Sequence, residues 1–142
     1  TNSNVLLVGE SGTGKELLAR TIRRSGAGKN DRFVTIHCAT RPAETLETQL
    51  FGQTAATGRG EAAQAGALRQ AGQGTVFLDE LSQLPLATQA KLLRAIEHQE
   101  YVPTGGTEPQ KHSARIIAAT TKDLLREVGE GRVQEDLFYR LD

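Results

Sequence analysis

The stretch "VLLVGESGTGKELLAR", residues 5–20, constrains the fold more than any other part of this chain. It has the pattern of a short apolar strand, a glycine-rich turn and the start of a helix. The turn matches G-x-x-x-x-G-K-[ST] up to Lys15 and departs from it at Glu16, where a hydroxyl side chain is usual. The glycines of this turn are Gly9, Gly12 and Gly14.

Such a turn is suited to phosphate. Glycines allow successive backbone N–H groups to converge, and the positive end of the following helix adds to the attraction for phosphate oxygens. Lys15 would place an ammonium group on the β- and γ-phosphates of a nucleotide. The alternative is a turn whose glycines serve backbone geometry alone. Because the motif lies between an apolar strand and an amphipathic helix, the sequence predicts a nucleotide-binding site.

A second motif, "TVFLDE" at 75–80, places two carboxylates directly after an apolar run. Open α/β sheets bind ligands at the carboxyl ends of their strands. Asp79 can hold Mg²⁺, usually through water, and Glu80 is placed to act as a general base on the attacking water. The alternative is that both acids cap the next helix. Two adjacent acids favour hydrolysis of the nucleotide over phosphoryl transfer to a second substrate.

Four further polar residues are candidates for this chemistry. Thr120 and Thr121 could bring a hydroxyl to the γ-phosphate, or they could end a strand and cap the following helix. Arg140 could reach the phosphate of a neighbouring subunit as an arginine finger, or it could be solvated. His37 could hydrogen-bond to Glu80 or have a structural role.

Apolar runs of strand length alternate along the chain with segments of helical periodicity. Strands are expected at 5–8, 33–36, 75–78 and 115–120, and helices at 15–24, 85–99 and 121–128. This alternation predicts an α/β fold around a mainly parallel sheet. Residues 52–74, rich in Gly, Ala and Gln, are expected to form a mobile surface excursion.

The two longer helices should each have an apolar face. In the first, Leu18 and Ile22 are expected on it. In the second, Pro85 suits the first turn. The expected face there comprises Leu86, Ala90, Leu93 and Ile96 or Glu97.

The composition excludes several classes of protein. The chain has 142 residues, enough for one domain with a core, and its 17 basic residues balance 17 acidic ones, so no overall charge points to nucleic acid. No apolar run approaches membrane-spanning length, and the single cysteine cannot form an internal disulfide. We therefore expect a soluble, cytoplasmic protein. No zinc site is expected, because paired zinc-ligand spacing is absent from His37, His98, His112 and Cys38.

Eight segments together are characteristic of one family. They are "GESGTGKELLAR", "FVTIHCA", "LFG", "GTVFLDE", "LPLATQAKLLRAIE", "GGT", "RIIAATTKDL" and "EDLFYRL". Through them the chain resembles, over essentially its full length, the AAA+ ATPase domain of bacterial enhancer-binding transcription activators that act on sigma-54 RNA polymerase. The resemblance implies a P-loop NTPase (AAA+) three-layer fold over residues 1–142, with ATP and Mg²⁺ as ligands.

The resemblance also implies how such a domain works. By this resemblance, subunits would form a ring, a hexamer, with ATP bound between neighbours. Hydrolysis would drive a loop, residues 53–65 here, that remodels the polymerase–promoter complex, while a separate domain binds DNA. The helical segment at the C-terminal end of the chain and the first strand at its start suggest a piece of a larger protein, without the family's last strand and helical lid. We therefore expect this piece to bind nucleotide weakly and to hydrolyse it very slowly.

Individual roles follow from matching motifs. Glu16 is regular for the family, and a carboxylate there can bind magnesium or its waters. Thr121 takes the sensor position, Arg140 matches an arginine finger, and His37 stands where the family has an Asn that switches the catalytic Glu80. The catalytic set implied is Glu80, Asp79, Thr121 and Arg140, with Asp79 and Glu16 at the metal. The cofactor-binding set implied is Gly9, Glu10, Ser11, Gly12, Thr13, Gly14, Lys15 and Glu16.

Some positions depart from the family pattern. The sigma-contacting loop reads G-A-F-T-G-A in the family and "TAATGR" at 54–59 here, with Ala56 at the phenylalanine position. Thr121 replaces the sensor Asn, and Gln134 stands at the position of the family's first arginine finger, with Arg132 nearby as a substitute. These departures leave two alternatives open: a degenerate nucleotide-binding regulatory module that does not engage sigma-54, and, more remotely, a metabolic kinase or another P-loop ATPase.

Overall fold

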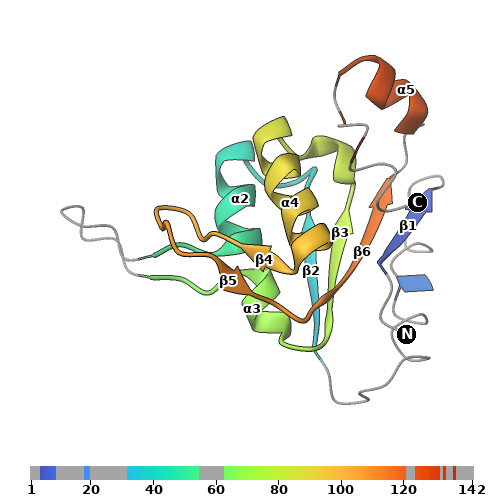
Figure 1. The fold of residues 1–142 in the computed structure, drawn as a ribbon. Helices are drawn as coiled ribbons and strands as arrows, with labels where there is room; N and C mark the ends of the chain where they lie inside the picture. Colours follow the sequence, from blue (N-terminus) through green and yellow to red (C-terminus); the bar gives the residue numbers. More distant parts are fainter. Residues whose placement is uncertain are drawn as a thin grey trace.

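A computed structural model describes residues 4–8, 18–19, 32–54, 63–120, 124–131, 133 and 136. Its main feature is a four-stranded, wholly parallel sheet with the strand order β1-β6-β3-β2 (Figure 1). The strands are β1 (Val5–Val8), β2 (Phe33–His37), β3 (Thr75–Asp79) and β6 (Arg115–Thr120). The predicted parallel α/β sheet is confirmed, with β2 and β3 each one residue longer than expected.

Helices of different lengths connect these strands. They are α2 (Ala43–Phe51), α3 (Ala67–Ala71), the short 3₁₀ helix η1 (Leu81–Gln83), α4 (Leu86–His98) and α5 (Leu124–Gly129). A small antiparallel hairpin, β4 (Glu100–Tyr101) with β5 (Gln110–Lys111), follows α4. None of the described helices is long and apolar enough to cross a membrane.

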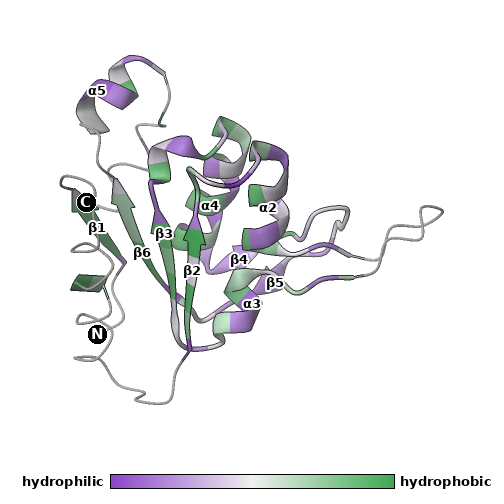
Figure 2. Cartoon of the chain, turned by 180° about the vertical axis from the view of Figure 1, so that it is seen from behind, coloured by the Kyte–Doolittle hydropathy of each residue, from purple (hydrophilic) through white to green (hydrophobic). Residues whose placement is uncertain are grey.

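The central strands β3 and β6 are buried on both faces, which explains their continuous apolar sequences. Val76 and Leu78 pack with α2, α3 and α4 on one face, whereas Phe77 and Ile117 pack with Ala19 on the other. Figure 2, drawn from behind, shows the strands of the sheet coloured mostly as hydrophobic, with α2 and α4 beyond them. The sheet is therefore the middle layer of the fold.

The buried face of α4 differs from the predicted one. Leu86 is 46% exposed and Ala90 is also exposed. Gln89 is fully buried because its side-chain amide donates a 2.8 Å hydrogen bond to the Leu84 carbonyl, so a polar residue occupies a core position. Pro85 is the N-cap and precedes the first turn. The fully buried positions are Thr88, Gln89, Leu92 and Ala95, while Leu93 and Ile96 are only partly buried.

The predicted apolar face of the first helix was also wrong at one position. Leu18 is 48% exposed, and its neighbour Ala19 is the fully buried residue. The small side chain of Ala19 packs against the large side chains of Phe77 and Ile117 on the sheet. Ile22 lies outside the described residues.

The expected surface excursion over 52–74 was wrong for α3. Three of its five residues, Ala67, Leu68 and Ala71, are at most 3% exposed and belong to the core. The small residues of this segment permit close packing of backbones: a Cβ on Gly66 would lie 2.2 Å from the Gly52 nitrogen. In the described part of this segment, Gly66 and the alanines of α3 therefore reflect tight contact, whereas residues 55–62 lie outside the described residues.

Candidate functional site

Polar side chains gather where three neighbouring strands end. His37 ends β2, Asp79 ends β3 and Thr120 ends β6, and the carboxyl ends of these parallel strands lie at the same edge of the sheet (Figure 1). Glu80 follows directly after β3. The structure thus brings together four of the residues singled out from the sequence, at the edge where open α/β sheets bind ligands.

Glu80 is held in an unusual conformation. Its backbone is left-handed, with φ 64° and ψ 61°, which is uncommon for a residue other than glycine. Its carboxylate oxygen Oε2 accepts hydrogen bonds from the Thr120 hydroxyl at 2.9 Å and from the Ser82 hydroxyl at 3.0 Å. The turn into η1 therefore directs the Glu80 side chain toward β6, and two hydroxyl donors fix its orientation.

The hydroxyl candidate Thr120 is fully buried and faces Glu80. The prediction that it ends a strand is correct, because β6 ends at this residue. Ser82 was not predicted. The signal that could have identified it is its position two residues after the acidic pair, where a tight turn returns its hydroxyl to the Glu80 carboxylate.

His37 contacts the other acid. Its Nδ1 lies 3.2 Å from Oδ2 of Asp79, whereas the sequence suggested a hydrogen bond to Glu80. That suggestion was wrong because His37 and Asp79 are register partners on adjacent strands, and Glu80 lies beyond the ladder. The side chains of His37 and Asp79 are 50% and 39% exposed, so this pair faces solvent at the edge of the sheet.

The acidic pair, Asp79 and Glu80, creates a negative electrostatic potential in its surroundings. Burial, followed by the negative charges of Asp79 and Glu80, raises the pKa of the Cys38 thiol to about 12. Cys38 therefore remains a neutral thiol at physiological pH and is unsuited to nucleophilic chemistry. The same two carboxylates suit a hard divalent cation such as Mg²⁺, which prefers oxygen ligands and keeps part of its water shell.

Several predicted site residues lie outside the described residues. These are the glycine-rich stretch from Gly9 to Lys15 with Glu16, the sensor candidate Thr121 and the arginine-finger candidate Arg140. Val8, the last described residue before this stretch, pairs with Thr120 at the end of β6, so β1 ends at the same edge of the sheet as β6.

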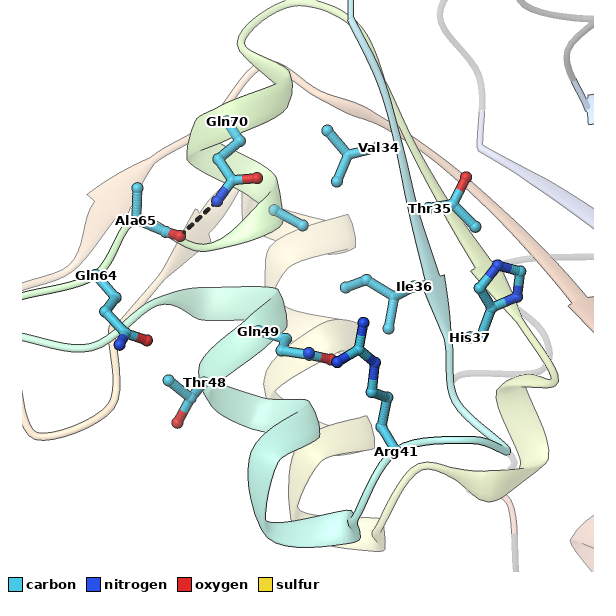
Figure 3. A pocket seen from close by; sticks show the side chains of 11 residues that line it. Val34, Thr35, Ile36, His37, Arg41, Thr48, Gln49, Gln64, Ala65 and Gln70 are labelled. Atoms are coloured by element: carbon cyan, nitrogen blue, oxygen red, sulfur yellow. Dashed lines mark hydrogen bonds between the residues drawn. The ribbon is translucent and has the colours of Figure 1, made fainter.

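A cavity of about 260 Å³ lies on the other side of β2. Figure 3 shows Val34 and Ile36 on one side of the strand, with Arg41 reaching toward Gln49, and the ring of His37 on the other side. His37 is nevertheless one of the residues that line the cavity, so the cavity adjoins the His37–Asp79 contact at the end of β2. The two acids, Asp79 and Glu80, do not line it, and the candidate site is the carboxyl edge of the sheet, where they lie.

Comparison with known proteins agrees with this geometry. Residues 1–142 match the family described as the Sigma-54 interaction domain. This chain belongs to that family. Among relatives of the sigma-54 interaction domain, UacR of Escherichia coli (strain K12) is 46% identical over 142 residues, covering 99% of this chain and 24% of UacR. The DNA-binding transcriptional regulator NtrC of Rhizobium meliloti (strain 1021) is 41% identical over 151 residues, covering 100% of this chain and 30% of NtrC.

Solved structures of similar proteins share the fold. NtrX from Brucella abortus in complex with ATP has a TM-score of 0.91 and 39% identity, covering 100% of this chain and 30% of that protein. The AAA+ P-loop fold expected for this sigma-54 interaction domain is confirmed. The chain spans roughly a quarter to a third of the length of the relatives it matches.

Proposed function

We propose that this chain is the ATP-binding and ATP-hydrolysing module of a sigma-54-dependent transcriptional activator. The observation that carries the proposal is the orientation of Glu80 beside Asp79, fixed by Thr120 and Ser82, within a chain of the sigma-54 interaction family. The complex of the similar NtrX with ATP supports the choice of nucleotide. Such a protein acts on polymerase, so its site of action is the cytoplasm.

Each candidate residue has a role in this proposal. Backbone amides of the stretch from Gly9 to Gly14 bind phosphate oxygens, and Lys15 adds a positive charge. Asp79, with Glu16, would hold Mg²⁺, and the ion would supply positive charge that neutralises the phosphates. Glu80 orients the attacking water and accepts its proton.

The remaining roles require a second subunit and further partners. In a hexameric ring, Arg140 of one subunit approaches the nucleotide of its neighbour and Thr121 senses the γ-phosphate. Residues 53–65 contact the sigma-54 RNA polymerase holoenzyme, and a separate domain binds DNA. Ala56, in place of the larger aromatic residue, reduces the apolar surface that this loop can offer.

Substitution of the proposed base tests the assignment. In the intact protein, Glu80→Gln should lower kcat for ATP hydrolysis by about 10²–10⁴-fold and abolish open-complex formation with sigma-54 holoenzyme, because the amide cannot accept the proton. ATP binding, measured by calorimetry, should persist. Glu44→Gln, an exposed acid on α2, is the matched control and should behave as wild type. Normal ATP turnover by Glu80→Gln would refute the mechanism. If the wild-type protein hydrolyses ATP but forms no open complexes, the result would instead support the alternative of a regulatory module that does not engage sigma-54.

A further inference from the structure

The base of segment 55–62 is a small three-stranded arrangement. Gln53 and Gln64 exchange two backbone hydrogen bonds, of 2.9 and 2.8 Å. On the other side, the Thr104 N–H donates to the Gly52 carbonyl at 2.9 Å and the Thr54 N–H donates to the Thr104 carbonyl at 3.0 Å. In Figure 1 these segments leave the body of the protein side by side with the turn between β4 and β5.

Thr104 belongs to that turn, so the arrangement joins two loops that are distant in sequence. One is the segment 55–62, whose ends are held by Gln53 and Gln64, and the other is the turn 105–109. A backbone ladder of this kind transmits displacement of one loop to the other, because its hydrogen bonds resist relative sliding. We call residues 52–54, 64 and 104 the loop base.

Glu47 on α2 joins the loop base to α4. Its Oε2 accepts a 3.0 Å hydrogen bond from the Thr104 hydroxyl and lies 3.5 Å from Nζ of Lys91 on α4. The Lys91 ammonium also lies 4.9 Å from the ring centroid of Phe51. The side chains of Glu47 and Lys91 are 30% and 28% exposed, so solvent screens their attraction less than at an open surface.

The same helix α4 leads back to the acidic pair. Ser82, which donates to the Glu80 carboxylate, belongs to η1, and η1 is followed directly by α4. The buried amide of Gln89 bonds the Leu84 carbonyl and fixes the junction between the two helices. A displacement at Glu80 therefore has a continuous path of hydrogen-bonded backbone and side chains to Lys91.

We propose that Glu47 is a positioning residue that couples the loop base to α4 and thereby to Glu80, setting how far nucleotide turnover moves the loops while leaving turnover itself unchanged. This coupling rests on the proposed function, in which segment 53–65 contacts sigma-54 holoenzyme. Glu47 is suited to the role because one carboxylate oxygen meets partners from both sides of the path.

The test removes one hydroxyl. In the intact protein, Thr104→Val keeps the side-chain shape and removes the donor to Glu47, whereas Thr104→Ser keeps the donor. For Thr104→Val we expect kcat and KM for ATP to stay within about twofold of wild type. The number of open complexes formed per ATP hydrolysed should fall about fivefold, because loss of one hydrogen bond changes an equilibrium by about that factor. Thr104→Ser should restore the wild-type ratio.

A second readout does not depend on activity. In Glu47→Gln, hydrogen exchange of the amides in the loop base should become faster while β3 and β6 keep wild-type protection. Glu44→Gln, on the same helix with an exposed side chain, is the control and should leave exchange unchanged.

The outcomes separate this coupling from the proposed function. If the wild-type protein hydrolyses ATP and Thr104→Val opens as many promoters per ATP as wild type does, the coupling alone is overturned. Unchanged hydrogen exchange in Glu47→Gln would also overturn the coupling alone. A parallel fall in kcat and opening would also overturn it, because Thr104 would then act on hydrolysis. An intact wild-type protein that hydrolyses no ATP would overturn the proposed function and the coupling together.

Discussion

At the scale of single residues, Glu80 is constrained by its backbone and by two donors. A residue other than glycine in the left-handed region costs on the order of 1–3 kcal/mol and persists only where the surroundings impose it. Thr120 and Ser82 supply that constraint through their hydroxyl groups. The strain is thus located at the residue proposed as the base, and the protein's own hydroxyl groups orient its carboxylate.

His112 gives a prediction at the same scale. Its Nε2 donates to the Ala95 carbonyl at 2.7 Å, and its Nδ1 accepts from the Ala114 N–H at 3.2 Å, so the buried ring is neutral. Burial lowers its pKa below 6.5. Below about pH 6.5 the unfolded chain binds a proton that the folded chain resists, so the free energy of unfolding should fall as pH decreases. The stabilisation is fully present above that pH.

Urea unfolding between pH 5 and 8 measures this effect. His112→Gln removes the titrating ring, so the stability difference between wild type and variant should be largest above pH 6.5 and should shrink as the pH falls. His37 and His98 are present in both proteins and cancel in the difference. Parallel pH profiles for the two proteins would show that His112 does not titrate with folding.

At the scale of elements, the sequence predicts the four strands of the parallel sheet, but it does not predict α2 or the small hairpin of β4 and β5. Runs such as 76–78 are apolar throughout because parallel strands are buried on both faces, and this signal needs no knowledge of their neighbours. The five-residue helix α3 was missed because it is too short to show a helical period. The His37–Asp79 contact was missed because it depends on which strands are adjacent, and a single sequence does not encode that order locally.

The contact between Gly52 and Gly66 gives a prediction at this scale. A Cβ on Gly66 would lie 2.2 Å from the Gly52 nitrogen and 2.5 Å from the Phe51 carbonyl carbon, both backbone atoms that cannot rotate away. We expect Gly66→Ala to destabilise the fold by about 3 kcal/mol or more, at the upper end of overpacking effects. In Gly129→Ala, where the added methyl meets open space, the effect should stay within about 0.5 kcal/mol. Thermal or urea unfolding of both variants decides the matter, and equal stabilities would show that the two backbones can separate at little cost.

At the scale of the whole molecule, the candidate site and the loop base lie in different parts of the fold. The carboxyl edge of the sheet holds the acidic pair, and α4 runs from that edge to the hairpin of β4 and β5 that carries Thr104 (Figure 1). In the proposed function, α4 therefore lies between the nucleotide site and the loop that contacts the polymerase. If a neighbouring subunit completes each nucleotide site, as we propose, assembly is part of the mechanism.

Mixing two inactive variants tests whether sites are shared between subunits. If Arg140 completes the site of its neighbour, Arg140→Ala and Glu80→Gln should each hydrolyse ATP far more slowly than wild type, by about 10³-fold or more for a lost arginine finger. An equimolar mixture should recover activity, because an Arg140→Ala subunit retains Glu80 and can receive Arg140 from a Glu80→Gln neighbour. With random assembly, about a quarter of the interfaces combine an intact base with an intact arginine, so turnover should reach about that share of wild type. Steady-state ATPase assays at a protein concentration that supports assembly measure the recovery. A mixture no more active than its components would place Arg140 outside the neighbouring site. If Arg140 acted only within its own subunit, every subunit of the mixture would lack either Glu80 or Arg140 and would stay inactive.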